Sequence, residues 1–102
     1  MEKEYISEEE FIKIKESALI IDVRDKLEHQ SLKSFPNSIN IPYEELIANP
    51  EKYITAKNQL IITYCNFGNR SGKAAHFLRS KGYARAFVLN GGIYNTTQQK
   101  ID

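Results

Sequence analysis

The chain has 102 residues, of which 41% are hydrophobic and 26% charged, and this composition is typical of one globular domain, here residues 1–102. Its 14 Lys and Arg residues nearly balance its 13 Asp and Glu residues, so nothing points to nucleic acid or a membrane surface as a partner. One cysteine excludes an internal disulfide, and with no apolar run long enough for a signal peptide or a membrane span we expect a cytoplasmic protein.

The N-terminal part of the chain alternates between helical and strand patterns. Ser7 followed by Glu10 is a capping-box pattern and predicts that a helix begins there. Residues 18–23 are short, apolar and rich in β-branched side chains, which predicts a buried strand. The polar stretch 24–37 predicts a weak helical turn at most, and residues 38–41 predict a short strand.

The C-terminal part continues this alternation. We expect a helix over 43–48 opened by Pro42, a buried strand over 59–64, a loop over 65–71, a helix over 72–81 ended by Gly82, and a strand over 86–89. Strands that alternate with helices, with continuous apolar runs, predict an α/β domain whose mostly parallel central sheet is covered by helices on both faces. Ligands of such sheets lie outside the carboxyl ends of the strands, where Cys65 is expected.

The segment after the strand 59–64 brings a cysteine to a tight turn before a helix. Backbone N–H groups in such a turn, around Gly68, have no intrahelical acceptor and can point toward the Cys65 sulfur. The helix N-terminus and the guanidinium of Arg70 add positive charge that favours a thiolate. We therefore expect Cys65 to have a lowered pKa and to act as a nucleophile and an anion receptor. The alternative is an inert cysteine buried in the core.

Several motifs resemble those of rhodanese-domain sulfurtransferases. Residues 65–75, Cys-Asn-Phe-Gly-Asn-Arg-Ser-Gly-Lys-Ala-Ala, resemble the active-site loop and the following helix of that family. Residues 21–24 resemble its Asp-Val-Arg strand end, 40–42 its Asn-Ile-Pro segment, and 91–93 its Gly-Gly-Ile turn. The motifs follow in the family's order over nearly the whole chain, which implies a rhodanese-like three-layer fold.

The resemblance also implies a chemistry. Cys65 would attack the outer sulfur of a donor such as thiosulfate, become a persulfide, and pass the terminal sulfur to cyanide, a thiol or a protein cysteine. The loop would stabilise the anionic persulfide, and Arg70 would help to hold the donor. The substrate-binding and persulfide-binding residues expected on this basis are Asn66, Phe67, Gly68, Asn69, Arg70 and Ser71. No metal or organic cofactor is needed, and the chain is expected to be a monomer or a weak dimer.

The chain departs from the family's pattern at two places. The family often has Gly-His-Ile-Pro-Gly-Ala before Asn-Ile-Pro, whereas residues 33–38 read Lys-Ser-Phe-Pro-Asn-Ser, so the local turn must differ. The family commonly places a Trp after the Gly-Gly-Ile turn, whereas residues 94–96 read Tyr-Asn-Thr. We expect a looser C-terminal cover of the domain there.

Outside the loop, Asp22 and Arg24 end the first buried strand near the expected cleft. We expect Asp22 to support the site through an ion pair to Arg70 or another loop group, and Arg24 to support the site rather than to contact substrate. Phe67 is expected at the mouth of the cleft. The other polar residues considered are expected at the surface, namely Glu28, His29, Glu44, Glu45 and His76. The two His and one Cys are too widely spaced for a metal cluster.

Two other functions remain open. A cysteine phosphatase also uses a thiolate and a cradle of N–H groups, but it places its Arg one residue further from the Cys than Arg70 is from Cys65. A binding or sensor module that keeps this fold without turnover usually lacks the Cys, and Cys65 is present. The sequence therefore favours the sulfurtransferase, then the sensor module, and the phosphatase last.

Overall fold

The computed structural model describes residues 3–96, which form a sheet of five strands with helices packed against it. The strands are β1 (Tyr5–Ile6), β2 (Leu19–Asp22), β3 (Ile39–Asn40), β4 (Ile61–Tyr64) and β5 (Ala86–Leu89). The α-helices are α1 (Glu8–Ile14), α2 (Lys26–Ser31), α3 (Tyr43–Ala48) and α4 (Asn69–Ser80). Short 3-10 helices are η1 (Lys15–Ser17), η2 (Pro50–Lys52) and η3 (Ile93–Asn95).

The sheet has the strand order β1-β5-β4-β2-β3, and all of its described strand pairs are parallel. Strand β4 lies in the middle, with Thr63 opposite Ile21 of β2 on one side and Val88 of β5 on the other. Cys65 directly follows this central strand. The carboxyl ends of β2 and β4 therefore meet at one edge, as predicted for a ligand site.

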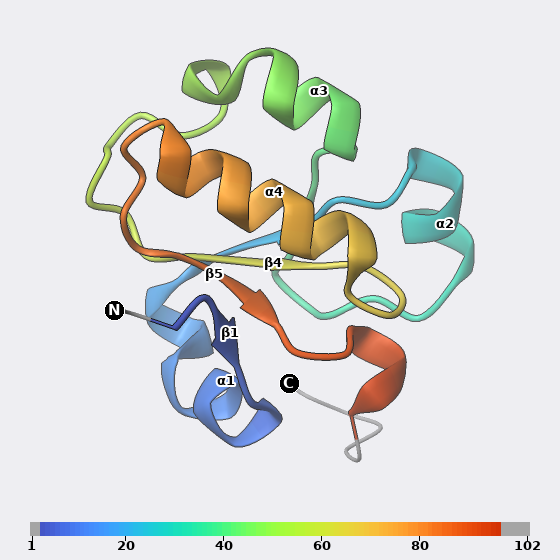
Figure 1. Cartoon of the computed structure of the whole chain (residues 1–102). Helices are drawn as coiled ribbons and strands as arrows, with labels where there is room; N and C mark the ends of the chain where they lie inside the picture. The colour runs from blue at the N-terminus through green and yellow to red at the C-terminus, as the bar shows by residue number, and fades with distance from the viewer. Residues whose placement is uncertain (1–2, 97–102) are drawn as a thin grey trace.

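Successive side chains of β4 point to opposite faces of the sheet, and each face has its own core. Ile61 and Cys65 belong to the core cluster under α3 and α4. Ile62 and Tyr64 belong to the second cluster, which includes Phe11 of α1. Figure 1 shows α3 and α4 on one side of the sheet and α1 on the other. The predicted α/β fold with helices on both faces is confirmed.

The structure differs from the prediction in the polar stretch 24–37, which contains the helix α2. Its first turn is a capping box: the Glu28 N–H donates to the Asp25 carboxylate at 2.8 Å, and the Asp25 N–H donates to the Glu28 carboxylate at 3.2 Å. The prediction of a weak turn was therefore wrong. Reciprocal capping offsets the low intrinsic stability of a six-residue helix.

Two further differences concern element ends. The last helix begins at Asn69 rather than at Gly72, because Gly68 already ends the loop with a positive φ of 107°. Strand β1 was not predicted, since two residues are too few for a recognisable pattern. It pairs with β5 through Tyr5 and Ile6.

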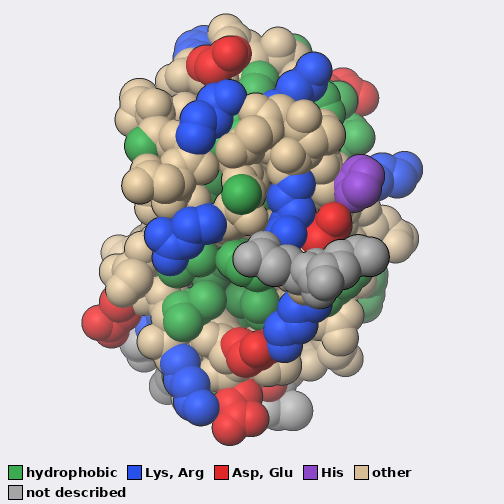
Figure 2. Space-filling view, turned by 60° about the vertical axis from the view of Figure 1, so that its left-hand side comes forward, with side chains coloured by type: hydrophobic (Ala, Val, Ile, Leu, Met, Phe, Trp, Pro, Cys, Tyr) green, Lys and Arg blue, Asp and Glu red, His purple; other side chains and the backbone are tan. Residues whose placement is uncertain are grey.

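The described surface carries both signs of charge. On the face shown in Figure 2, Lys and Arg side chains are interspersed with Asp and Glu side chains, and apolar side chains lie between them. This mixture matches a formal net charge of +1. Within residues 3–96 no helix has both the length and the apolar character that crossing a membrane requires.

Candidate active site

The loop between β4 and α4 is shaped by one glycine. Gly68 has a φ of 107° and a ψ of −8°, a left-handed conformation that glycine adopts without a steric penalty. The chain reverses there and enters α4 at Asn69. The N–H groups at the start of α4 have no acceptor inside the helix, and some of them face back toward Cys65.

The Cys65 sulfur receives hydrogen bonds from this loop and from the first turn of α4. The Gly68 N–H donates to Sγ at 3.2 Å and the Ser71 N–H at 3.4 Å. The Ser71 hydroxyl oxygen lies 3.3 Å from Sγ. The cysteine is only 2% exposed, so these groups take the place of water around the sulfur. The arrangement is a cradle for an anion.

Two opposing effects act on the pKa of Cys65. Burial raises the pKa of the thiol, but the hydrogen bonds from the Ser71 hydroxyl and from the N–H groups of Ser71, Gly68 and Phe67 outweigh burial and lower it. The predicted lowering of the Cys65 pKa agrees with the structure. Its main source is the set of loop donors, of which Ser71 supplies two.

The turn after β5 is hydrogen-bonded to the backbone of the cysteine loop. The Ile93 N–H donates to the Cys65 carbonyl at 2.9 Å, and the Tyr94 N–H donates to the Asn66 carbonyl at 3.2 Å. Gly92 has a φ of 79° and contacts the same backbone so closely that it leaves no space for a side chain. This support was not predicted, although the Gly-Gly-Ile motif marked the turn. Ile93 itself is buried, whereas Tyr94 and Asn95, where a looser cover was expected, are exposed.

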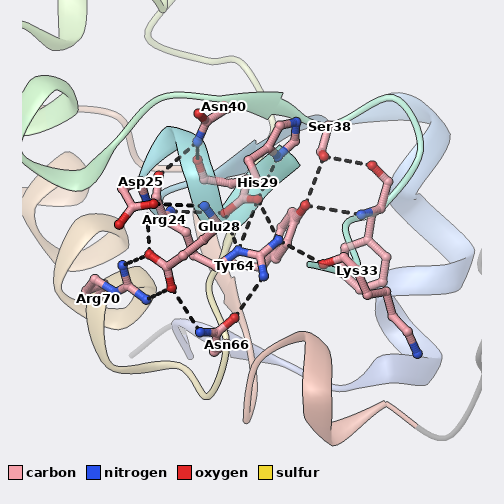
Figure 3. A network of polar contacts seen from close by, with 12 residues as sticks. Arg24, Asp25, Glu28, His29, Lys33, Ser38, Asn40, Tyr64, Asn66 and Arg70 are labelled. Carbon is pink, nitrogen blue, oxygen red and sulfur yellow. Dashed lines mark hydrogen bonds and ion pairs between the residues drawn. The ribbon is translucent and has the colours of Figure 1, made fainter. Parts of the chain in front are cut away.

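Arg24 connects the end of β2 to the loop. Its Nε donates to both carboxylate oxygens of Asp22 at 2.9 and 3.1 Å, and its Nη2 donates to Oδ2 at 2.8 Å. Its Nη1 donates to the Asn66 side-chain oxygen at 2.8 Å, and Nη2 also donates to the Lys33 carbonyl at 2.9 Å (Figure 3). Arg24 is fully buried, and its hydrogen bond fixes the side chain of Asn66.

The prediction that Asp22 forms an ion pair with Arg70 or another loop group was wrong. Asp22 is fully buried and accepts from Arg24, and its carboxylate also lies 2.7 Å from His29 Nδ1. It therefore acts on the loop only through Arg24 and Asn66. His29 was expected at the surface, but its ring lies against the Asp22 carboxylate.

Glu28 was expected to be a surface charge, but its carboxylate lies in the site. Its carboxylate accepts two hydrogen bonds from the Arg70 guanidinium at 2.8 and 3.0 Å, and one from the Asn66 amide at 3.1 Å (Figure 3). The hydrogen bonds from Arg70 lower the pKa of Glu28 to about 2. The signal that could have revealed it is the spacing Asp25-x-x-Glu28, since a capping helix places Glu28 in front of the loop.

The remaining predicted residues have exposed side chains. Phe67 is 69% exposed, and its ring packs in a tilted orientation against Tyr94 with centroids 5.7 Å apart; its position at the mouth of a cleft stays a prediction. Asn69 is exposed at the start of α4. His76 is exposed and pairs with Glu4 at 3.2 Å, as expected for a surface residue. Within residues 3–96 no group of three His, Cys, Asp or Glu could hold a metal ion.

A pocket of about 260 Å³ opens beside the loop, between the ends of β2 and α3. Its residues are Val23, Asp25, Pro42, Tyr43, Glu44 and Arg70. Val23 donates its N–H at 3.0 Å to the carbonyl of Tyr64, the residue before Cys65, and Arg70 lies in the first turn of α4 directly after the loop. A small molecule in this pocket would therefore lie next to the cysteine loop.

Comparison with known proteins agrees with this geometry. The family model of the Rhodanese-like domain matches residues 7–99. A tRNA uridine(34) hydroxylase of Cytophaga hutchinsonii is 33% identical over 80% of this chain and 27% of its own length. The adenylyltransferase and sulfurtransferase uba4 of Ogataea parapolymorpha is 36% identical over 78% of this chain and 20% of its own. The chain thus spans less than a third of these two relatives.

Two solved structures match over nearly the full length of both chains. A rhodanese-related protein from Thermoplasma volcanium superposes with a TM-score of 0.78 at 30% identity, covering 89% of this chain and 87% of that one. The human single-domain sulfurtransferase TSTD1 superposes with a TM-score of 0.73 at 26% identity, covering 89% of this chain and 92% of its own.

Proposed function

The chain belongs to the rhodanese-like domain family, and from that premise we propose that it is a sulfurtransferase whose Cys65 carries the transferred sulfur. The observation that carries this proposal is the cradle of Gly68 and Ser71 hydrogen bonds around a buried sulfur. Such a cradle favours an anion at the sulfur position, and both the thiolate and the persulfide are anions.

In the first step the Cys65 thiolate attacks the outer sulfur of a sulfane-sulfur donor. With thiosulfate, a new S–S bond forms at Cys65, the S–S bond of thiosulfate breaks, and sulfite leaves with the electron pair. The enzyme then holds a persulfide whose terminal sulfur is anionic. The lowered pKa of Cys65 supplies the thiolate that this attack needs.

In the second step an acceptor nucleophile attacks the terminal sulfur. With cyanide, the product is thiocyanate and the Cys65 thiolate is restored. A thiol acceptor in its thiolate form gives a new persulfide in the same way. The N–H groups of Gly68 and Ser71 are fixed before the reaction begins, so they stabilise the leaving thiolate without reorganisation.

The names of the relatives support the class of reaction more than its substrates. One is named a sulfurtransferase together with an adenylyltransferase, and one solved relative is a single-domain sulfurtransferase. Other relatives are named tRNA uridine(34) hydroxylases, of which this chain spans only 23–30%. We therefore propose transfer to a small thiol or a protein thiol, and no hydroxylase activity. A reducing compartment such as the cytoplasm would keep Cys65 free to react.

Intact mass measurement after incubation with a sulfane-sulfur donor tests the proposal. We expect a gain of one sulfur atom on the natural chain, removed by cyanide with release of thiocyanate. Cys65→Ser should gain none, because a hydroxyl is a poor nucleophile at neutral pH, while circular dichroism should show an intact fold. Sulfur transfer that persists in Cys65→Ser, or no loading from any donor, would refute the proposal.

A further inference from the structure

The pocket beside the cysteine loop carries more negative than positive charge. Asp25 and Glu44 line it, and Arg70 is the only cation among its lining residues in the described part of the chain. The rest of its lining is mostly apolar, from Val23, Pro42 and Tyr43. An incoming donor therefore meets two carboxylates beside an apolar surface.

The positive charge of Arg70 is already offset. Its guanidinium holds the Glu28 carboxylate through two hydrogen bonds, and the low pKa of Glu28 keeps that carboxylate ionised at neutral pH. The nearby Arg24 is fully buried and paired with Asp22, so it adds no free charge. The two carboxylates of the lining, Asp25 and Glu44, and the Glu28 carboxylate paired with Arg70 thus outnumber the single guanidinium of the pocket.

This imbalance affects donors according to their charge. Coulomb energy is proportional to charge, so a dianion is repelled by Asp25 and Glu44 twice as strongly as a monoanion at the same place. The N–H groups of the loop act only on the sulfur that they contact, since dipole effects fall off within one helical turn. The carboxylates of the pocket wall would therefore disfavour a dianionic donor more than a monoanionic one, even where the loop binds the outer sulfur of both equally well.

The proposed sulfur transfer is the basis for this inference. We propose that the pocket selects organic sulfane-sulfur donors with one negative charge or none, and disfavours the dianion thiosulfate. The organic group would lie on Val23, Pro42 and Tyr43. With an organic thiosulfonate, the Cys65 thiolate takes the outer sulfur, the S–S bond of the donor breaks, and a sulfinate leaves with the electron pair. Charge and atoms balance in this step.

The test compares thiosulfate with methanethiosulfonate, which replaces one charged oxygen of thiosulfate by a methyl group. Both donors are assayed with cyanide as the acceptor, and kcat/KM is measured for each. Glu44→Gln removes one carboxylate of the pocket, and Glu45→Gln is the matched control. Glu45 is the next residue on α3, does not line the pocket, and accepts from the Tyr53 hydroxyl at 3.3 Å.

We expect the natural chain to prefer methanethiosulfonate at low salt. Glu44→Gln should raise kcat/KM for thiosulfate more than for methanethiosulfonate, so that the preference falls by about threefold or more, and raising the ionic strength should also reduce it. Glu45→Gln should leave the preference within about twofold, since its charge is further from the pocket. Comparing variants cancels the intrinsic difference in reactivity between the donors.

The outcomes separate this inference from the proposed function. If the preference for methanethiosulfonate over thiosulfate is the same in the natural chain and in Glu44→Gln, the charge selection is wrong. It is also wrong if Glu45→Gln reduces this preference as much as Glu44→Gln does. Sulfur transfer itself would stand in either case. Failure of both donors to load Cys65 would instead refute the sulfurtransferase itself.

Discussion

Gly92 lies against the backbone of Asn66, with no room for a side chain between them. A methyl group on Gly92 would overlap the Asn66 carbonyl and lie 2.6 Å from the amide nitrogen of Phe67. The turn after β5 and the cysteine loop are therefore in direct backbone contact. Any shift of that turn must displace the loop that surrounds the Cys65 sulfur.

Gly92→Ala should accordingly reduce both stability and sulfur loading. The positive φ of Gly92 alone costs a non-glycine residue about 1–3 kcal/mol, and the overlap with Asn66 adds to this. Urea denaturation and intact mass after donor treatment measure the two effects. Gly82→Ala is the control, because Gly82 also has a positive φ of 99° but faces only the flexible end of Lys57. Equal sulfur loading in the two variants would contradict the contact's role.

Ser71→Ala should move the reactivity of Cys65 to higher pH. Ser71 supplies the hydroxyl that lowers the pKa of Cys65, whereas its N–H remains in the variant. The rate of alkylation by iodoacetamide against pH reports the change, with the natural midpoint expected below the free-cysteine value of about 8.5. Ser80→Ala, at the other end of α4, should leave the profile unchanged. A natural midpoint at or above the free-cysteine value would show that the loop does not activate the thiol.

Asp22→Asn should destabilise the fold strongly. The substitution leaves the Arg24 guanidinium buried without its counter-charge, and breaking a buried pair typically costs about 3–5 kcal/mol. Replacing both members, as in Asp22→Leu with Arg24→Met, should cost less than the single change, because no charge stays buried. Urea denaturation compares them. The double variant should still lose sulfur transfer, since the hydrogen bond from Arg24 to Asn66 is gone.

The Asp22–Arg24 pair also predicts how the free energy of unfolding changes at acid pH. Burial alone raises the pKa of Asp22, but hydrogen bonds from Arg24 and His29 outweigh it and lower the pKa. A lowered native pKa contributes stability above the unfolded value of about 3.9, and this is lost as pH falls through the native pKa. The natural chain should therefore lose more unfolding free energy below about pH 4 than the double variant. Parallel losses would show that other carboxylates dominate.

The length of the loop predicts a lack of phosphatase activity. Donors stabilise an oxyanion best at about 2.7–3.1 Å, and a tetrahedral phosphate in this short loop would overlap some of them. The natural chain should not hydrolyse a small aryl phosphate. A variant with one residue inserted between Gly68 and Arg70 should lose sulfur transfer before it gains anything. Aryl phosphate turnover by the natural chain that is absent from Cys65→Ser would favour the phosphatase.

The sequence was most informative where local patterns decide the structure. The apolar runs that became β2, β4 and β5 predicted the buried parallel sheet, and the glycine after Cys65 predicted the turn. The position of Cys65 at a strand end followed from these elements. Helix α4 began earlier than predicted, because the conformation of Gly68 lets Asn69 and Arg70 be helical at once.

The connections within the site depended on tertiary contacts that no local pattern shows. Glu28 and Arg70 lie 42 positions apart and meet only because α2 folds over the loop. Asp22 was expected to pair with Arg70 or another loop group, but Arg24, two residues further along the chain, binds both of its carboxylate oxygens. The role of Gly92 depends on the strand order, which places the end of β5 next to the end of β4.

Cys65 is the only cysteine of this chain, and this affects how it withstands oxidants. A thiolate that reacts with peroxide becomes a sulfenic acid, which a neighbouring thiol normally traps as a disulfide before further oxidation. No such thiol exists within these 102 residues. Recovery must therefore come from a thiol outside these 102 residues.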